Sequence, residues 1–225
     1  MNLTGISSIR IPEGSVRSIT VGGRIIWQKN TIPAEYTALA YIESTRKQYI
    51  DTGIMAKDNT RVVLDFSLDE LPDDTNSKYI FGARTALNKN SFALMCQYRT
   101  KRYRTHYANE YLDSELDALG RHLIDMNGNT CVIDSEELEF RTGSFSSGCP
   151  MYLGTLNTKG KPFANGLIGK IYACQIYDNG ILVRDFIPCR RDSDGEVGMY
   201  DRVTETFFGN AGTGEFVAGE KENAS

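Results

Sequence analysis

The chain has no large excess of charge of either sign and no long apolar run. Its 225 residues carry 25 Lys and Arg against 29 Asp and Glu, a net charge of −4, with no basic tract. It therefore lacks the uniform positive field that attracts nucleic acid and anionic membranes. The longest apolar stretches are far shorter than the ~20 residues that span a bilayer, and the first residues lack the basic and apolar regions of a secretory signal. We expect neither nucleic acid nor a membrane as a partner.

Cysteine and histidine are sparse and irregularly placed. The five cysteines are an odd number with no C-x-x-C pair, unlike a disulfide framework or a zinc site. They are Cys96, Cys131, Cys149, Cys174 and Cys189. Free cysteine is commonly buried, so we expect buried, reduced thiols and synthesis in a reducing cytoplasm. Neither His106 nor His122 has a Cys or His at ligand spacing, so no metal site is predicted.

Short strands joined by glycine-containing turns organise the chain. The turns Gly22-Gly23, Asn127-Gly128 and Asn179-Gly180 lie between strand-like runs and supply the positive φ angles of hairpins. Alternation of apolar and polar residues over 61–68 predicts a strand with one buried face. One or two helical turns are the most that Tyr111 to Leu119 allow. Further strands are expected at 36–41, 48–54, 79–81, 92–98, 102–107, 151–153 and 197–200. This pattern predicts an all-β fold, an antiparallel β-sandwich.

A domain boundary is expected near residue 30. We interpret residues 1–30 as a hairpin unit, residues 31–219 as the sandwich, and the polar end, 220–225, as a flexible tail. The segment before Pro33 is typical of a linker. A single hairpin is marginally stable in water unless it packs on something, so we predict that this unit docks on another protein. The apolar residues expected to dock are Ile19, Val21, Ile25 and Trp27.

Three parts of the chain resemble a known family. The first is YIESTRKQYIDTGI at 41–54. The second joins RHLIDMNG at 121–128 with VID, LG and GLIGKI further on. The third joins DFIPC at 185–189, VGMYD at 197–201 and FFGNAGTG at 207–214. Together they are similar to the concanavalin A-like (laminin-G-like) jelly-roll domains attached to bacteriophage structural proteins, over residues 36–219. The resemblance implies a jelly roll made in the bacterial cytoplasm and carried on the virion, where it binds carbohydrate or the host surface.

Motifs that would carry catalysis or hold a metal are incomplete. The glucanase branch of this fold uses a Glu-x-Asp-x-Glu strand that presents three carboxylates on one face, whereas here only Glu137 and Glu139 share a face. The segment Asp192 to Glu196 has Gly at the fourth position, where an EF-hand calcium loop has it at the sixth. We expect a solvated strand edge and a polar turn, with no enzyme activity and no cofactor. A rim calcium ion, which some laminin-G-like relatives hold, stays open without assigned ligands.

One segment, which we call the tyrosine–basic belt, concentrates side chains suited to recognition. Tyrosine rings stack on sugars, and arginine pairs with acidic sugars or phosphates. On a strand, Tyr103 and Tyr107 share one face. Two interpretations stay open: a ligand site, or tyrosines that fill a strand by propensity beside basic residues that keep it soluble. The belt consists of Tyr98, Arg99, Arg102, Tyr103, Arg104, His106, Tyr107 and Tyr111.

The function that these features predict is a non-enzymatic virion protein that binds host-surface polysaccharide. Its expected partners are other virion proteins, contacted through the N-terminal hairpin, and a homo-oligomer stays open. A capsid or tail decoration protein with a purely structural role is the alternative, and a glycan hydrolase is the third hypothesis. Glycan binding by the isolated protein distinguishes the first two, and turnover of a surface polysaccharide would support the third.

Overall fold

The chain divides into two compact units, Met1–Pro33 and Ala34–Ser225. The structure, a computed structural model, describes residues 18–21, 24–28, 32–73 and 75–222. In the first unit, strand β1 (Ser18–Val21) pairs antiparallel with β2 (Arg24–Gln28), as the predicted hairpin requires. The turn Gly22-Gly23 and the side chains expected to dock, those of Ile19, Val21, Ile25 and Trp27, lie outside the described part.

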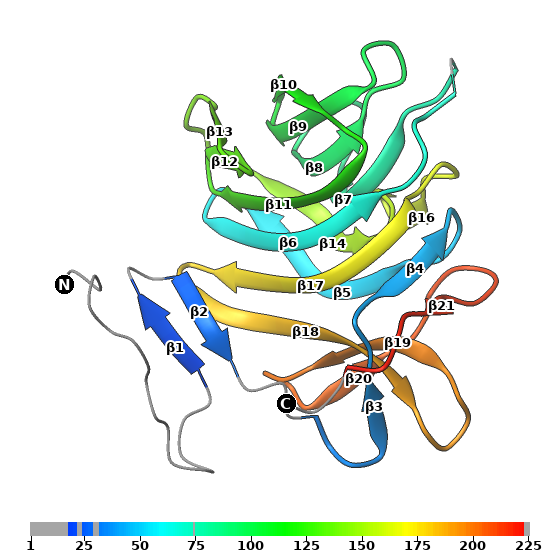
Figure 1. The fold of residues 1–225 in the computed structure, drawn as a ribbon. Helices are drawn as coiled ribbons and strands as arrows, with labels where there is room; N and C mark the ends of the chain where they lie inside the picture. Colours follow the sequence, from blue (N-terminus) through cyan, green and yellow to red (C-terminus); the bar gives the residue numbers. More distant parts are fainter. Residues whose placement is uncertain (1–17, 22–23, 29–31, 74, 223–225) are drawn as a thin grey trace. The chain divides into compact units, whose positions relative to one another are not determined.

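Two sheets build the second unit and form the predicted β-sandwich of jelly-roll type (Figure 1). The smaller sheet contains, from one edge to the other, β10 (Glu110–Asp117), β9 (Arg102–Ala108), β8 (Ser91–Cys96), β7 (Lys78–Arg84), β14 (Ser146–Leu153) and β5 (Ile50–Lys57). In addition, β15 (Asn157–Thr158) pairs with β7, and β16 (Lys161–Pro162) pairs with β15. Only the short pairing of β15 with β7 is parallel among the described strand pairs. The described residues contain no helix that could cross a membrane.

The larger sheet lies in front of the smaller one in Figure 1. It contains, in spatial order, β13 (Glu136–Glu139), β12 (Thr130–Ile133), β11 (Gly120–Asn127), β6 (Thr60–Leu68), β17 (Ile168–Asp178), β18 (Ile181–Arg191), β19 (Val197–Asp201) and β20 (Thr206–Phe208). At its side lie β3 (Tyr36–Ala38), β4 (Ile42–Thr45) and β21 (Val217–Ala218). Both long hairpins predicted for this unit, β11–β12 and β17–β18, are present.

The core lies between the two sheets and follows from alternation along the strands. Val62, Leu64 and Phe66 of β6 are fully buried, as the period-two pattern predicts. Phe66 meets Tyr103 of the opposite sheet edge-to-face, with ring centroids 5.7 Å apart. Burying an aromatic side chain of this size contributes about 2–3 kcal/mol. All five cysteines are also buried and free, which confirms the prediction of buried thiols.

The segment Tyr111 to Leu119 corrects one prediction, because it forms strand β10 and not a helical turn. Leu112 and Leu116 are four residues apart, a spacing that satisfies both a helix face and a strand face. Ser114 between them is fully buried, so three alternate residues point inward, as in a strand. Pairing of β10 with β9 supplies backbone hydrogen bonds that a helix of two turns could not replace.

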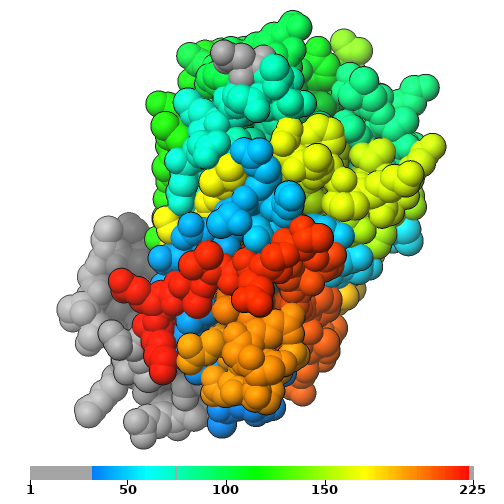
Figure 2. All heavy atoms as spheres, turned by 90° about the vertical axis from the view of Figure 1, so that its right-hand side faces the viewer, coloured from blue at the N-terminus to red at the C-terminus, as the bar shows by residue number. Residues whose placement is uncertain are grey.

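The C-terminal residues also differ from the expected flexible tail. Ala40 donates a backbone hydrogen bond to Glu220 (2.8 Å), and Glu222 donates one to Ala38 (3.1 Å). Figure 2 shows the last described residues, in red, lying across the surface beside the blue segment to which β4 belongs, and β21 pairs with β4. Residues 220–222 therefore belong to the sheet ladder, and only 223–225 lie outside the described residues.

Candidate functional site

Two members of the tyrosine–basic belt are core residues, which corrects their choice as ligand contacts. Tyr103 and Tyr107 are 0% and 2% exposed. The hydroxyl of Tyr103 donates to the carbonyl oxygen of Ala118 (2.7 Å), and that of Tyr107 donates to the carbonyl oxygen of Asp58 (3.1 Å). The reason is parity: odd-numbered residues of β9 point between the sheets. These two rings cannot stack on a ligand from solvent.

The even-numbered residues of β9 point to the outer face of the smaller sheet. Arg104 forms two hydrogen bonds with the carboxylate of Asp113 (2.5 and 2.7 Å), and its guanidinium carbon lies 4.0 Å from the ring centroid of Tyr111. Arg102 pairs with Glu115. The structure therefore brings Arg104, Tyr111 and His106 together on this face.

The remaining belt residues lie at the turn between β8 and β9. Arg99 is exposed, and its Nε donates to the hydroxyl of the partly buried Tyr98 (2.7 Å). This pair lies in the turn that precedes β9, whereas Arg104 and Tyr111 lie within β9 and β10. The role of the belt in binding stays a prediction for the residues that reach solvent.

His106 is the least expected member of the belt. The side chain is 3% exposed, and within the described residues neither ring nitrogen has a hydrogen-bond partner. The ring centroid lies 5.7 Å from that of Tyr111, its neighbour on β10. Burial, and then the positive charges of Arg104 and Arg84, lower the pKa of His106 to about 4. The imidazole is therefore neutral near pH 7.

The other histidine behaves as a structural residue. Nδ1 of His122 lies 2.8 Å from a carboxylate oxygen of Asp134, and Nε2 lies 3.2 Å from the carbonyl oxygen of Leu119.

The polar segment at 136–139 is edge strand β13, where the Glu136 carboxylate accepts from the hydroxyl of Ser114 (2.7 Å). Both positions are explained by local hydrogen bonding.

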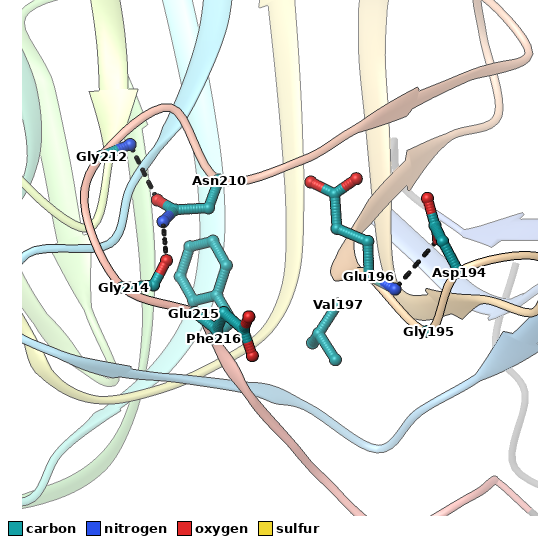
Figure 3. A pocket seen from close by; sticks show the side chains of 9 residues that line it. All are labelled: Asp194, Gly195, Glu196, Val197, Asn210, Gly212, Gly214, Glu215 and Phe216. Atoms are coloured by element: carbon teal, nitrogen blue, oxygen red, sulfur yellow. Dashed lines mark hydrogen bonds between the residues drawn. The ribbon is translucent and has the colours of Figure 1, made fainter.

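A cavity of about 390 Å³ lies between the turn that joins β18 to β19 and the loop that follows β20 (Figure 3). Apolar side chains, carboxylates and glycine backbone line it together. The lining residues are Asp194, Gly195, Glu196, Val197, Asn210, Gly212, Gly214, Glu215 and Phe216. Ligand pockets commonly have volumes of roughly 300–1,000 Å³ and mix apolar surface with a few placed polar groups. The cavity is therefore large enough for a small ligand.

The loop wall of the cavity is held by two side-chain amides. Oδ1 of Asn210 accepts from the backbone N–H of Tyr49 (3.1 Å) and of Gly212 (2.8 Å), and its Nδ2 donates to the carbonyl oxygen of Gly214 (2.7 Å). Nε2 of the buried Gln48 donates to the carbonyl oxygen of Glu215 (3.0 Å). These bonds fix the loop in one conformation before any ligand arrives.

Glycine is required in this loop for a steric reason. A Cβ atom at Gly212 would lie 1.9 Å from the carbonyl oxygen of Lys47, closer than any side chain can approach. The backbone at 212 therefore packs directly on the segment that precedes β5. This close packing adds to the amide hydrogen bonds in holding the loop.

The opposite wall is a turn organised by one arginine. Arg191 donates hydrogen bonds to both carboxylate oxygens of Asp194 and also pairs with Glu196. Hydrogen bonds from the Arg191 guanidinium, and to a smaller extent from the backbone N–H of Glu196, lower the pKa of Asp194. Glu215 is exposed on the loop wall, and the ring of the buried Phe216 lies beside it, on the same side of the cavity as Asn210 (Figure 3). No group of three His, Cys, Asp or Glu among the described residues could hold a metal ion.

The cavity was not predicted from the sequence. Its two walls are separated in the chain, and the amides that hold the loop reach across the fold: Gln48 and Glu215 are 167 residues apart. The sequence feature that could have indicated it is the segment Asn210 to Gly214, which contains one asparagine and two glycines. It carried the family resemblance but was not assigned to a site.

Comparisons with known proteins place the fold. No protein-family model matches the chain, and no curated protein matches its sequence. Among solved structures, the chain is similar to a candidate carbohydrate-binding protein from Bacteroides ovatus, with a TM-score of 0.55 and 10% identity over 83% of this chain and 61% of that one. The chain thus spans less than two thirds of that protein. The likeness supports a shared β-sandwich fold.

Two further solved structures have lower scores. Trypanosoma rangeli sialidase in complex with sialic acid gives a TM-score of 0.42 at 11% identity, over 75% of this chain and 34% of the sialidase. The native heptameric SAP-like pentraxin of Limulus polyphemus gives 0.42 at 8% identity, over 83% of this chain and 95% of the pentraxin.

Proposed function

We propose that the protein is a carbohydrate-binding module and that the sugar occupies the cavity between the β18–β19 turn and the loop after β20. The observation that carries this proposal is the preorganised loop wall, held by Asn210 and Gln48 before a ligand binds. A wall that is already ordered loses little conformational entropy on binding. The carbohydrate-binding description of the Bacteroides protein of similar fold supports the same class of ligand.

The chemistry of the lining suits a polyhydroxylated ligand. Sugar hydroxyls donate hydrogen bonds, and the side chains of Glu215 and Asp194, when ionised, act only as acceptors. The apolar surface of Val197 and Phe216 can contact the C–H face of a sugar ring. A cavity of about 390 Å³ suits a ligand of one or two rings.

Binding is favoured over hydrolysis by the environment of Asp194. A glycosidase needs a general acid whose pKa is raised so that it stays protonated. The hydrogen bonds from Arg191 do the opposite at Asp194, because they favour its ionised form. At β13 the Glu-x-Asp-x-Glu pattern of the glucanase branch is incomplete. We therefore propose a non-enzymatic role.

The place of action that we propose is a bacteriophage particle. The resemblance of residues 36–219 to domains of phage structural proteins supports it, as does the presence of a separate N-terminal unit that contains a hairpin. In this proposal the hairpin contacts other virion proteins and the sandwich faces the host surface. Labelling purified particles with antibody against the sandwich tests it, and label absent from intact particles would contradict it.

The sugar site is tested with the full chain and an array of bacterial capsular and cell-wall polysaccharides, followed by calorimetry on each ligand found. We expect Glu215→Gln to weaken binding about tenfold, because it removes a charged hydrogen-bond acceptor. We expect Asp194→Asn to weaken it as well, because it removes the carboxylate that Arg191 holds in the turn. Glu137→Gln, an exposed glutamate on β13, is the matched control and should change nothing.

Two outcomes would contradict the proposal. Equal affinity of Glu215→Gln, Asp194→Asn and the control would place the sugar elsewhere. Binding to no polysaccharide of the array would favour the structural decoration role. Release of reducing ends from a bound polysaccharide would support the hydrolase hypothesis, and we expect none.

A further inference from the structure

A buried arginine without a carboxylate partner lies at the end of β7. Arg84 is 9% exposed; its Nε donates to the hydroxyl of Thr158 (3.1 Å) and its Nη1 to the hydroxyl of Tyr79 (3.1 Å). Among the described residues no Asp or Glu forms an ion pair with it, and Nη2 makes no hydrogen bond. A guanidinium stays charged and brings five N–H donors, so this group has donors and a charge left over.

His106 lies on the same face of the smaller sheet, and its two ring nitrogens are the only buried side-chain nitrogen or oxygen atoms without a hydrogen-bond partner among the described residues. In the cross-strand register Gly82 of β7 opposes Ala93 of β8, and Ala93 opposes His106 of β9. Arg84 is two residues beyond Gly82 on the same strand face. A neutral imidazole carries one N–H donor and one acceptor, and a buried polar group with neither used requires a physical explanation.

The carboxylate near these two groups is already paired with another residue. Arg84 and Arg104 both act on His106 as positive charges, and Asp113 is the carboxylate that opposes them. Both oxygens of Asp113 are already held by Arg104. In a chain with a net charge of −4, this part of the outer face is locally positive.

We propose that Arg84 and His106 form a binding site for an oxyanion, a carboxylate or phosphate group, separate from the cavity at Asn210. Arginine recognises both groups through paired N–H donors, and the imidazole supplies one more. The loop that carries Thr158 and Phe163 lies over this part of the sheet, with Phe163 packed on Tyr79 at 4.9 Å between centroids. A bound anion satisfies the unused donors of both residues.

Access to the site is controlled by Tyr111. Its side chain is 46% exposed and its ring adjoins both His106 and Arg104. In this proposal a rotation of the Tyr111 ring opens the imidazole to solvent and offers an aromatic face to the ring of an acidic sugar. The exposed residues of the tyrosine–basic belt then act beside the anion site and not in place of it.

The experiment titrates the full chain with sodium glucuronate, with glycerol phosphate and with glucose as the neutral control. The chain has two histidines, so its ring signals in NMR spectra are readily assigned with His106→Phe. We expect glucuronate or glycerol phosphate to shift the His106 signal and to raise its pKa above about 4, while glucose leaves it unchanged. The anion that binds identifies the carboxylate or the phosphate as the natural group.

Variants locate the anion. Arg84→Gln should weaken anion binding about ten- to hundredfold, because a charged donor is lost. Arg121→Gln is the matched control: Arg121 also stacks on a tyrosine, Tyr172, but on the other sheet and already paired with Asp65, so anion affinity should stay within about twofold. Because Arg84→Gln also removes contacts to the Thr158 loop, His106→Phe is the second variant, and it should fold and still weaken binding.

The outcomes separate this proposal from the sugar cavity. No shift of the His106 signal with either anion, or unchanged affinity in both Arg84→Gln and His106→Phe, would overturn the anion site. Glu215→Gln, which tests the cavity, should leave anion binding intact. Loss of polysaccharide binding in Glu215→Gln alone, with anion binding retained, is the expected result if both sites exist.

Discussion

The Tyr103 hydroxyl donates a hydrogen bond of 2.7 Å to the carbonyl oxygen of Ala118, and both residues are fully buried. The bond joins β9 of the smaller sheet to the segment that leads into β11 of the larger one. A residue chosen from the sequence as a ligand contact is therefore part of the contact between the two layers.

Replacing Tyr103 by Ala should cost about 3–5 kcal/mol of stability, because a large cavity opens in the core. Tyr103→Phe keeps the ring but leaves the carbonyl of Ala118 without its donor, and should cost about 1–2 kcal/mol. Urea unfolding measures both. Tyr111→Ala, at a half-exposed ring, is the control, and a loss as large as that of Tyr103→Ala would argue against the assigned burial.

Stability should fall as the pH is lowered from about 6.5 to about 4 because of His106. Its pKa is lowered to about 4 in the folded state from 6.5, so in this window the unfolded chain binds a proton that the folded chain does not. The loss reaches roughly 3 kcal/mol at pH 4. Since carboxylates also titrate at low pH, the measurement is the difference between wild type and His106→Phe in thermal melts from pH 4 to 8. A constant difference would mean that His106 ionises as freely as in the unfolded chain.

The cysteines should resist thiol reagents until the protein unfolds. Burial raises the pKa of Cys96, Cys131 and Cys189 to about 12, and reaction requires an exposed thiolate. Ellman's reagent at pH 8 should release no signal from native protein and a full signal of five thiols per chain in denaturant. Fast labelling of one thiol in native protein would show local opening at that position.

Removal of residues 1–30 should leave the sandwich folded. The second unit contains the described core, and the boundary between units falls after Pro33. The shortened chain should melt in one cooperative transition with the same midpoint as the sandwich in the full chain, and it should no longer join the particle. An unfolded product would assign the hairpin to the core of the sandwich.

The fold was predictable from the sequence wherever one face of a strand is buried. The buried Val62, Leu64 and Phe66 alternate with the less buried Val63 and Asp65, and Asn179-Gly180 adopts positive φ at both positions. Local pattern therefore predicted both β6 and the β17–β18 hairpin. Leu112 and Leu116 led to the wrong prediction of a helical turn, because a spacing of four residues fits both the helix period and the strand period. In such a case, only the neighbouring strand decides between helix and strand.

The site was less predictable, because it depends on which face of a strand is inside. Alternation places Tyr103 and Tyr107 together but does not tell the core face from the outer face when both carry large side chains. Arg84 was not predicted as a site residue either. That no carboxylate pairs with it is known only once the order of β7, β8 and β9 in the sheet is known. The cavity at Asn210 depends on contacts between segments far apart in the chain.

The pairing of residues 38–40 with 220–222 has a mechanical consequence. The two segments run antiparallel, so the chain enters and leaves the sandwich at the same end of one short ladder. A force that pulls these two ends apart acts on one hydrogen bond of the ladder at a time. The bonds therefore break one after another and do not share the load. A sandwich anchored on one side only never experiences that load, whereas one stretched between two anchors would begin to unravel at the outermost bond, from Glu222 to Ala38.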